Sequence, residues 1–158
     1  MTIRIGILTL SDRSARGERE DESGPALARL VQAGGWSVIK QAILPDDLPQ
    51  IRDLLMEWAD SGELDLLLTT GGSGFAPRDV TPEATRAVID REAPGLAEAM
   101  RAASLKSTPH AMLSRVLAGM RGRTLIVNLP GSPKGAWENL AVILQVLEHT
   151  VEKIQRKE

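Results

Sequence analysis

One short apolar run in the middle of the chain limits the possible folds more than any other feature. Residues 64–69 are leucine-rich at successive positions, so a strand formed by them would be apolar on both faces. Such a strand is typical of the centre of a parallel sheet, where helices cover each side. The run therefore predicts a layered α/β structure in which it forms a buried central strand.

Segments of strand length alternate with segments of helical periodicity along the chain. Strands are expected where β-branched and other apolar residues gather, at residues 3–10, 36–44, 64–69 and 124–129. Helices are expected where apolar residues recur at helical spacing, at residues 23–33, 51–58, 81–92, 96–104 and 133–154. The alternation predicts a single domain over residues 1–158. Its fold class would be α/β, a three-layer αβα sandwich with a mostly parallel sheet.

Local signals refine these elements. Ser23 and Thr81 are each expected to cap the helix that follows, and residues 11–24 are expected to form a polar loop. The three tryptophans lie on predicted strand or helix faces and are expected in the core. Residues 114–120 form either a strand paired with residues 124–129 or the end of a helix. The second apolar face of the last helix is either tightly covered or a subunit interface.

Composition narrows the classes of function. The net charge is -2 and no Lys/Arg-rich block precedes the C-terminal tail, so no nucleic-acid partner is expected. The chain contains no cysteine, which excludes disulfides, thiolate catalysis and cysteine-ligated metals. The apolar N-terminal run is too short for a signal peptide or a membrane span. We therefore expect a cytoplasmic protein without a membrane partner.

Four polar segments each follow a predicted strand. They are residues 11–14, 45–47, 71–79 and 128–134. In open α/β sheets, ligands bind beyond the carboxyl ends of the strands, so these segments are expected to converge on one edge. Their convergence would form a binding site.

The segment 71–79 is rich in glycine, which lets backbone N–H groups approach a ligand closely. Such N–H groups bind phosphate without a positive side chain. The segment is not a P-loop, which needs Lys followed by Ser or Thr after its last glycine. It is not a dinucleotide-binding fingerprint either, because Pro77 stands where glycine or alanine is needed. A tight turn without a ligand is the alternative interpretation of the glycines alone.

Two aspartates extend this interpretation to a metal. Asp79 follows the glycines and is not needed as a cap if Thr81 serves, so a magnesium ligand beside phosphates is the expectation. A turn residue or a local partner of Arg78 is the alternative. Asp46 has the same possible role, although Asp46 or Asp47 can equally be a helix cap. The last polar segment is either a proline-shaped turn or an anion site. Three cations are candidate counter-charges: Arg13, Arg78 and Lys134. Histidine catalysis is not expected.

Taken together, the motifs resemble the molybdopterin-binding family of molybdenum cofactor biosynthesis, whose domain also occurs in gephyrin. The residues that carry the resemblance are TLSDRS at 9–14, LTTGGSGFAPRDVTPEAT at 68–85, LSR at 113–115 and NLPGSPKG at 128–135. Many members have threonine where Ser73 stands. The resemblance covers nearly the whole chain. It implies a homotrimer with one antiparallel edge hairpin, and so favours a strand at residues 114–120 and an interface on the last helix.

The resemblance also implies a reaction. Adenylate would pass from the co-substrate ATP, with Mg²⁺ as cofactor, to the terminal phosphate of molybdopterin, and pyrophosphate would leave. Asp46 and Asp79 would be the catalytic and metal-binding residues. The substrate-binding residues would be Ser11, Asp12, Gly71, Gly72, Ser73, Gly74, Ser114, Asn128, Gly131, Ser132 and Pro133. A molybdate-insertion enzyme is a further expected partner. The alternative is a homologue that binds molybdopterin without adenylating it.

Overall fold

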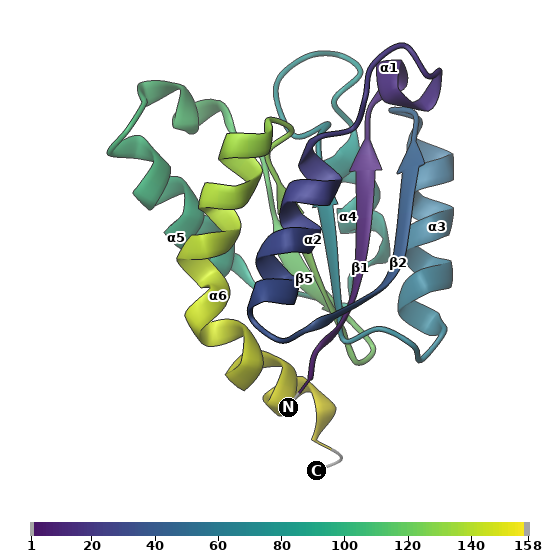
Figure 1. Cartoon of the computed structure of the whole chain (residues 1–158), viewed down its shortest axis with the longest axis vertical. Helices are drawn as coiled ribbons and strands as arrows, with labels where there is room; N and C mark the ends of the chain where they lie inside the picture. The colour runs from purple at the N-terminus through teal and green to yellow at the C-terminus, as the bar shows by residue number, and fades with distance from the viewer. Residues whose placement is uncertain (1, 157–158) are drawn as a thin grey trace.

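The computed structural model describes residues 2–156 and shows a six-stranded sheet between two layers of helices (Figure 1). The strands are β1 (Arg4–Leu10), β2 (Ser37–Leu44), β3 (Leu66–Thr70), β4 (Arg91–Glu92), β5 (Ala118–Arg121) and β6 (Thr124–Leu129). The helices are α1 (Asp12–Ala15), α2 (Ser23–Ala33), α3 (Leu48–Asp60), α4 (Thr81–Val88), α5 (Pro94–Leu105), the 3-10 helix η1 (Pro109–Leu113) and α6 (Pro133–Gln155).

The sheet has the order β2-β1-β3-β6-β5-β4. β3 is buried at every position and pairs in parallel with β1 and β6. β2 is parallel to β1, whereas β5 is antiparallel to β6 and β4 is antiparallel to β5. The predicted three-layer fold is therefore confirmed, including the strand interpretation within residues 114–120.

β4 corrects one prediction. The sequence predicts a helix through residues 81–92, but α4 ends at Val88, and Ile89 is already extended. The backbone then pairs with β5, since the Asp90 N–H donates to the Met120 carbonyl and the Ala93 N–H to the Ala118 carbonyl. Pairing with a neighbouring strand thus replaces the last helical turn, and the predicted hairpin lies one strand inside the sheet edge.

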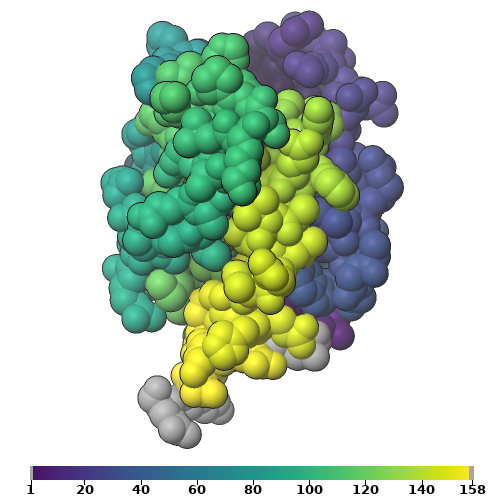
Figure 2. All heavy atoms as spheres, turned by 90° about the vertical axis from the view of Figure 1, so that its left-hand side faces the viewer, coloured from purple at the N-terminus to yellow at the C-terminus, as the bar shows by residue number. Residues whose placement is uncertain are grey.

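The helices divide between the two faces of the sheet. α2, α5 and α6 pack on one face, and α3 and α4 pack on the other. Figure 2 shows α5 and α6 side by side on the molecular surface. Trp58 is buried, but Trp137 is 47% exposed, because α6 turns a different stripe of side chains inward. The expectation of a core position for Trp137 is therefore wrong. No helix within residues 2–156 is long and apolar enough to cross a membrane.

Two hydroxyl groups expected to cap helices have another use. Ser23 is the first residue of α2, and its Oγ donates to the Gly131 carbonyl at 2.7 Å. Thr81 is the first residue of α4, and its Oγ1 donates to the Gly71 carbonyl at 2.9 Å. Neither side chain caps its helix. Each instead fixes a loop at the carboxyl edge of the sheet.

Side-chain caps occur at other helices on the same edge, among them α1 and α3. Ser11 Oγ accepts the Ser14 N–H, so part of the predicted polar loop folds into the single turn of α1. Asp47 accepts the Gln50 N–H and caps α3. The cap alternative therefore belongs to Asp47, which leaves the neighbouring Asp46 carboxyl free of that role.

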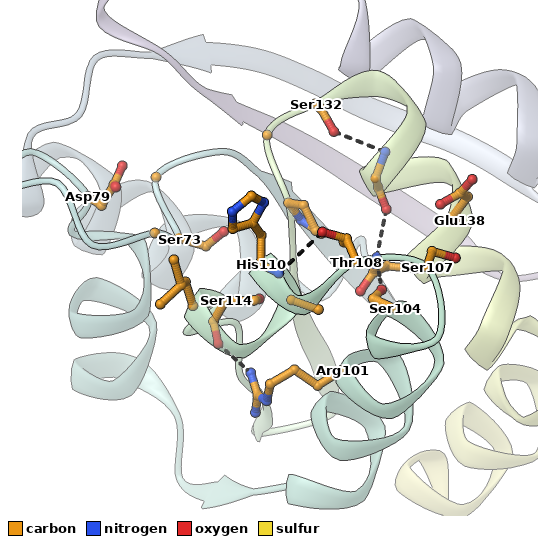
Figure 3. A pocket seen from close by; sticks show the side chains of 18 residues that line it. Ser73, Asp79, Arg101, Ser104, Ser107, Thr108, His110, Ser114, Ser132 and Glu138 are labelled. Carbon is orange, nitrogen blue, oxygen red and sulfur yellow. Dashed lines mark hydrogen bonds between the residues drawn. The ribbon is translucent and has the colours of Figure 1, made fainter.

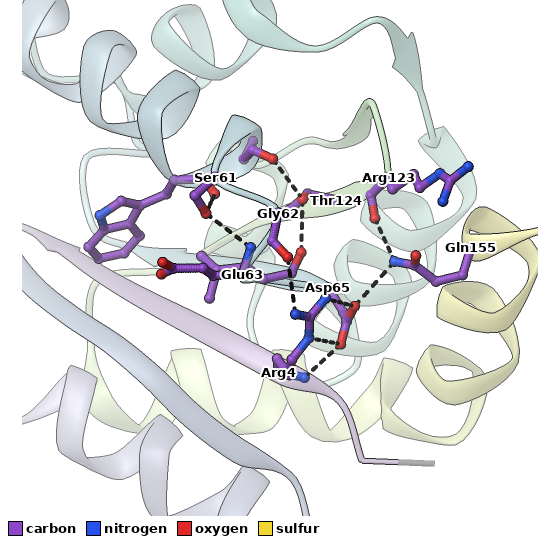
Figure 4. A network of polar contacts seen from close by, with 11 residues as sticks. Arg4, Ser61, Gly62, Glu63, Asp65, Arg123, Thr124 and Gln155 are labelled. Carbon is purple, nitrogen blue, oxygen red and sulfur yellow. Dashed lines mark hydrogen bonds and ion pairs between the residues drawn. The ribbon is translucent and has the colours of Figure 1, made fainter.

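The amino edge of the sheet holds a different buried carboxylate, that of Asp65 (Figure 4). The Arg4 backbone N–H and Nη2 each donate to Asp65 at 2.9 Å. Gln155 Nε2 donates to the same carboxylate at 3.2 Å and to the Arg123 carbonyl at 3.0 Å. This cluster ties the end of α6 to the start of the sheet.

Candidate active site

The four polar segments meet at the carboxyl edge of the sheet. The Asp46 N–H donates to Asp12 Oδ1 at 2.9 Å, and the Asp12 N–H donates to Asp46 Oδ2 at 3.2 Å. Arg78 reaches back from the glycine-rich segment and donates twice to the Asp12 carboxylate, each time at 2.8 Å. A Cβ on Gly131 would lie only 3.2 Å from the Gly71 Cα. The loops after β1, β2, β3 and β6 are thus in mutual contact.

Glycine is required at the first two positions of the glycine loop, which we define as residues 71–74. Gly71 and Gly72 have positive φ angles of 104° and 65°. A Cβ on Gly71 would lie 2.2 Å from the Leu10 carbonyl oxygen, and one on Gly72 would lie 2.9 Å from Asp46 Oδ1. The glycines therefore allow the loop to pass directly over β1 and beside the Asp46 carboxyl group.

Several backbone N–H groups in the loops after β3 and β6 have no internal partner. Within residues 2–156, no hydrogen bond of the chain uses the N–H groups of Gly72, Ser73, Gly74, Gly131 and Ser132. Clustered N–H groups of this kind bind anions, and phosphate in particular. The two loops can therefore hold a phosphate without a lysine or arginine.

Asp46 carries a carboxyl group that the chain satisfies on one side only. Its Oδ2 accepts the Asp12 N–H, whereas its buried Oδ1 has no hydrogen-bond partner. Burial raises the pKa of the Asp46 carboxyl, and repulsion from Asp12 and Asp79 adds to the rise. A cation next to Oδ1 would supply the missing contact and favour the charged carboxylate. The site therefore fits a divalent metal ion.

Asp79 lies on the same side of the molecule. Its Oδ2 accepts the Ala76 N–H at 2.9 Å, and a Cβ on Gly74 would lie 2.9 Å from that oxygen. No group of three or more His, Cys, Asp or Glu residues suited to a metal occurs in the described part of the chain. Two carboxylates suit Mg²⁺, because it takes its remaining ligands from water and substrate phosphates.

A cavity of about 500 Å³ opens between the glycine loop and helices α5 and α6 (Figure 3). Asp79 and Ser73 lie on one side of it, and Ser104, Ser107 and Glu138 lie on the other. Two hydroxyl groups and one carboxylate therefore line the end that is distant from Asp79. The cavity is large enough for a small organic ligand.

Ser114 supplies an unsatisfied group in this cavity. Its buried Oγ has no hydrogen-bond partner, and its carbonyl accepts Arg101 Nη1 at 2.8 Å. A buried hydroxyl without a partner is costly in a folded chain, so a ligand that bonds to it would bind more tightly.

A second cavity, of about 340 Å³, lies on the other side of the glycine loop. Asp46, Ser11 and Arg19 line it. The two cavities have part of their lining in common, namely Gly72, Gly131 and Ser132, which we call the shared wall. Two ligands bound side by side would therefore meet at backbone N–H groups, with Asp46 on one side and Asp79 on the other.

The predicted site residues divide between these cavities. The first takes Ser73, Gly74, Asp79 and Ser114 besides the shared wall. The second takes Ser11, Asp46, Gly71 and Pro133 besides the shared wall. Asp12 lines neither cavity, because its carboxylate is paired with Arg78 and the Asp46 N–H.

Asn128 is not brought to either cavity. Its side chain is fully buried, and its Nδ2 donates to the hydroxyls of Thr69 and Thr85 at 3.0 and 2.9 Å. Its Oδ1 accepts the Leu117 N–H at 3.3 Å. Every polar atom of this amide is hydrogen-bonded inside the protein, so Asn128 has a structural role next to the site.

Sequence reasoning missed two arginines and a histidine at this edge. Arg101 and His110 line the first cavity. Arg115 donates a hydrogen bond to the Gly74 carbonyl of the glycine loop. The LSR motif contained Arg115, but nothing in that motif indicates its partners. The expected counter-charges fit less well, since Arg13 is exposed and Lys134 lies 3.9 Å from Glu138 on the helix surface.

Comparisons with known proteins agree with this geometry. A family model described as "Probable molybdopterin binding domain" matches residues 6–149. Molybdopterin adenylyltransferase from Helicobacter pylori J99 is 41% identical over 155 residues, which cover 97% of this chain and 88% of the relative. Gephyrin from Dictyostelium discoideum is 41% identical over 163 residues and 97% of this chain, but the chain spans only 23% of its length.

A solved structure agrees as well. The molybdopterin biosynthesis enzyme MoaB from Thermus thermophilus is 53% identical, with a TM-score of 0.92. The match covers 97% of this chain and 96% of that one. The similarity therefore extends over the whole fold, including all four loops of the site.

Proposed function

This chain belongs to the molybdopterin-binding domain family, and we propose that it is a molybdopterin adenylyltransferase of molybdenum cofactor biosynthesis. In the proposed reaction, an oxygen of the terminal phosphate of molybdopterin attacks the α-phosphorus of ATP. A new phosphorus–oxygen bond forms, the bond to the β-phosphate breaks, and pyrophosphate leaves. The product is adenylyl-molybdopterin.

The shared wall is the observation that carries this proposal. A transfer between two phosphorylated reactants needs both phosphates at one place and in a fixed orientation. One reactant in each cavity would bring its phosphate to the N–H groups of Gly72, Gly131 and Ser132. Asp46 and Asp79 would then flank the reacting atoms from opposite sides.

The proposed reaction does not depend on acid or base catalysis by side chains. A phosphate monoester has a second pKa of about 6, so the attacking phosphate is already mostly dianionic at neutral pH. No residue has to remove its proton. The main barrier is repulsion between two anions, which positioning and charge neutralisation overcome. Unused backbone N–H groups supply part of that neutralisation.

We further propose that Asp46 and Asp79 hold Mg²⁺ together with phosphate oxygens. When bound, the ion supplies positive charge between the anionic reactants. Two features of the carboxyl groups themselves support this assignment. Packing leaves Asp46 Oδ1 without an internal partner, and the Ala76 N–H fixes the orientation of the Asp79 carboxylate.

Incubation of the protein with molybdopterin, Mg²⁺ and ATP labelled at the α-phosphate tests the proposal. We expect the label to appear on molybdopterin and unlabelled pyrophosphate to be released. Binding of molybdopterin without transfer of the label would support the alternative, a binding homologue without adenylyltransferase activity. If the protein neither binds molybdopterin nor transfers the label, molybdopterin is excluded as its ligand.

We also propose that the protein is a cytoplasmic homotrimer and that its product passes to a molybdate-insertion enzyme. One large apolar side chain of α6 supports an interface on that helix, since Val146 is 42% exposed. Native mass spectrometry should find three chains per particle. Val146→Glu should shift the particles toward single chains by placing a charge in the contact.

A further inference from the structure

Arg115 binds the glycine-rich segment at both ends. Its backbone N–H donates to the Ser73 carbonyl at 2.8 Å, and its Nε donates to the Gly74 carbonyl at 2.7 Å. Its Nη2 donates to the Asp79 carbonyl at 2.8 Å. One residue therefore spans the segment from the glycine loop to the second aspartate of the site.

These bonds also determine where the backbone N–H groups point. In a trans peptide plane, the carbonyl of one residue and the N–H of the next point in opposite directions. The Arg115 backbone N–H holds the Ser73 carbonyl and its guanidinium holds the Gly74 carbonyl, so the N–H groups of Gly74 and Phe75 both point away from Arg115, and the side chain sets the direction of the Phe75 N–H. No hydrogen bond within residues 2–156 uses either N–H group. They therefore remain available to a ligand.

Glu83 keeps the guanidinium in place. Its two carboxylate oxygens accept Arg115 Nη1 at 2.6 Å and Nη2 at 3.2 Å. A planar guanidinium can make this paired contact and reach two carbonyls at once, because it carries five donors in a fixed plane. A lysine ammonium has the charge but cannot span the same acceptors.

We propose that Arg115 is a positioning residue for adenylyl transfer: its guanidinium holds the segment from Gly74 to Asp79, two residues that line the first cavity, in the conformation that receives the anionic reactants. The proposal rests on the proposed function for its reaction. The conformation of this segment does not depend on turnover, so it can be tested with pyrophosphate, the expected product. Pyrophosphate binding needs no turnover.

Arg115→Lys is the test variant, and Arg121→Lys is its matched control. Arg121 makes bonds of the same kind, with two contacts to Asp60 at 2.9 and 3.0 Å and one to the Val88 carbonyl at 2.9 Å. It lies at the β5–β6 hairpin and lines neither cavity. Loss of folding stability should therefore be similar in the two variants.

We expect Arg115→Lys to weaken pyrophosphate binding about tenfold and to lower kcat/KM for adenylyl transfer about 100-fold, because small displacements of catalytic groups have effects of this size. The KM for ATP should rise and kcat should fall. Arg121→Lys should bind pyrophosphate within about twofold of the wild type, since surface contacts remote from a site have small effects. Calorimetric titration and thermal unfolding of both variants provide the comparison.

Unchanged pyrophosphate binding in Arg115→Lys, or an equal loss in Arg121→Lys, would overturn the proposal. Glu83→Gln is a milder second variant if Arg115→Lys does not fold. It should weaken pyrophosphate binding less than Arg115→Lys and more than Arg121→Lys, and no loss in it would count against the proposal. If the wild type transfers no adenylate but its pyrophosphate affinity still depends on Arg115, the proposed function fails and the role of Arg115 stands.

Discussion

Two carboxyl groups at opposite edges of one sheet, one buried and one half-buried, have contrasting environments. At the amino edge, Asp65 accepts hydrogen bonds from Arg4 and Gln155. At the carboxyl edge, Asp46 has one oxygen without any partner. Burial acts to raise the pKa of both groups, but the Arg4 contacts reverse the effect and hold the pKa of Asp65 below its usual range.

The difference separates stability from function within one fold. A buried carboxylate with a complete set of donors stabilises the structure that surrounds it. A buried carboxyl with a missing partner costs stability, and the cost is recovered only when a ligand supplies the contact. The amino edge is therefore a closed structural contact, and the carboxyl edge has an open contact that the proposed cation would fill.

The largest expected effect is on activity at the carboxyl edge. Asp79→Ala should lower adenylyl transfer by about 1,000-fold or more, because it removes a proposed ligand of the Mg²⁺ ion that offsets the charge of the reacting phosphates. Molybdopterin binding should remain largely intact, since the first cavity keeps its other walls. Single-turnover assays with Mg-ATP, together with a binding titration, measure both quantities. Normal turnover by this variant would show that the metal assignment is wrong.

Two asparagine substitutions should change stability in opposite directions. Asp65→Asn should lower the free energy of unfolding by about 2 kcal/mol, below the value for fully buried pairs because Arg4 is partly exposed. Asp46→Asn should raise it by about 1 kcal/mol, because it removes repulsion from Asp12 and Asp79. Urea denaturation measures both changes. A loss of similar size in the two variants would remove the contrast between the edges.

Changes of pH should reveal the same contrast. The folded-state pKa of Asp65 is lowered, so its stabilising effect is complete above about pH 4 and is lost as the pH falls through the folded pKa. The folded-state pKa of Asp46 is raised, so its favourable contribution is complete below about pH 4 and is lost as the pH rises through the folded pKa.

The corresponding measurement is urea denaturation from about pH 7 down to about pH 3. The deficit of Asp65→Asn relative to the wild type should shrink as the carboxylate it lacks becomes protonated. The advantage of Asp46→Asn should shrink over the higher part of that range. Advantages or deficits that stay constant with pH would mean that these charges are not the cause.

The smallest expected effect is that of Ser73→Ala. Ser73 is buried at the glycine loop, but in the proposed function the loop acts through its backbone. We expect a loss of less than about tenfold in kcat/KM, the size of one modest hydrogen bond. A loss as large as that of Asp79→Ala would mean that the hydroxyl itself takes part in the reaction.

The sequence predicts those features of the fold that follow from hydrophobic periodicity and from the order of elements along the chain. The apolar run of β3 required a central position, and strands followed by polar loops had to bring those loops to one edge. The two-residue strand β4 was missed, because its pairing with β5 depends on residues far away in the chain. Its own composition carries no strand signal.

Side-chain partners at the site were beyond the reach of the sequence for a similar reason. Asp46 and Asp47 are adjacent and chemically identical, so only the structure separates the helix cap from the unsatisfied carboxyl. Ser23 and Thr81 stand where caps are common, yet their hydroxyls bond to distant carbonyls. Arg115 contacts residues more than thirty positions away, and no local pattern identifies such partners.

The shared wall has a consequence for synthesis of the protein. Gly72 comes from the middle of the chain, while Gly131 and Ser132 come directly before the last helix. A nascent chain thus lacks one half of the wall until most of its residues have left the ribosome. Neither reactant can find its complete pocket on a partly translated molecule, so catalytic competence arrives late and all at once.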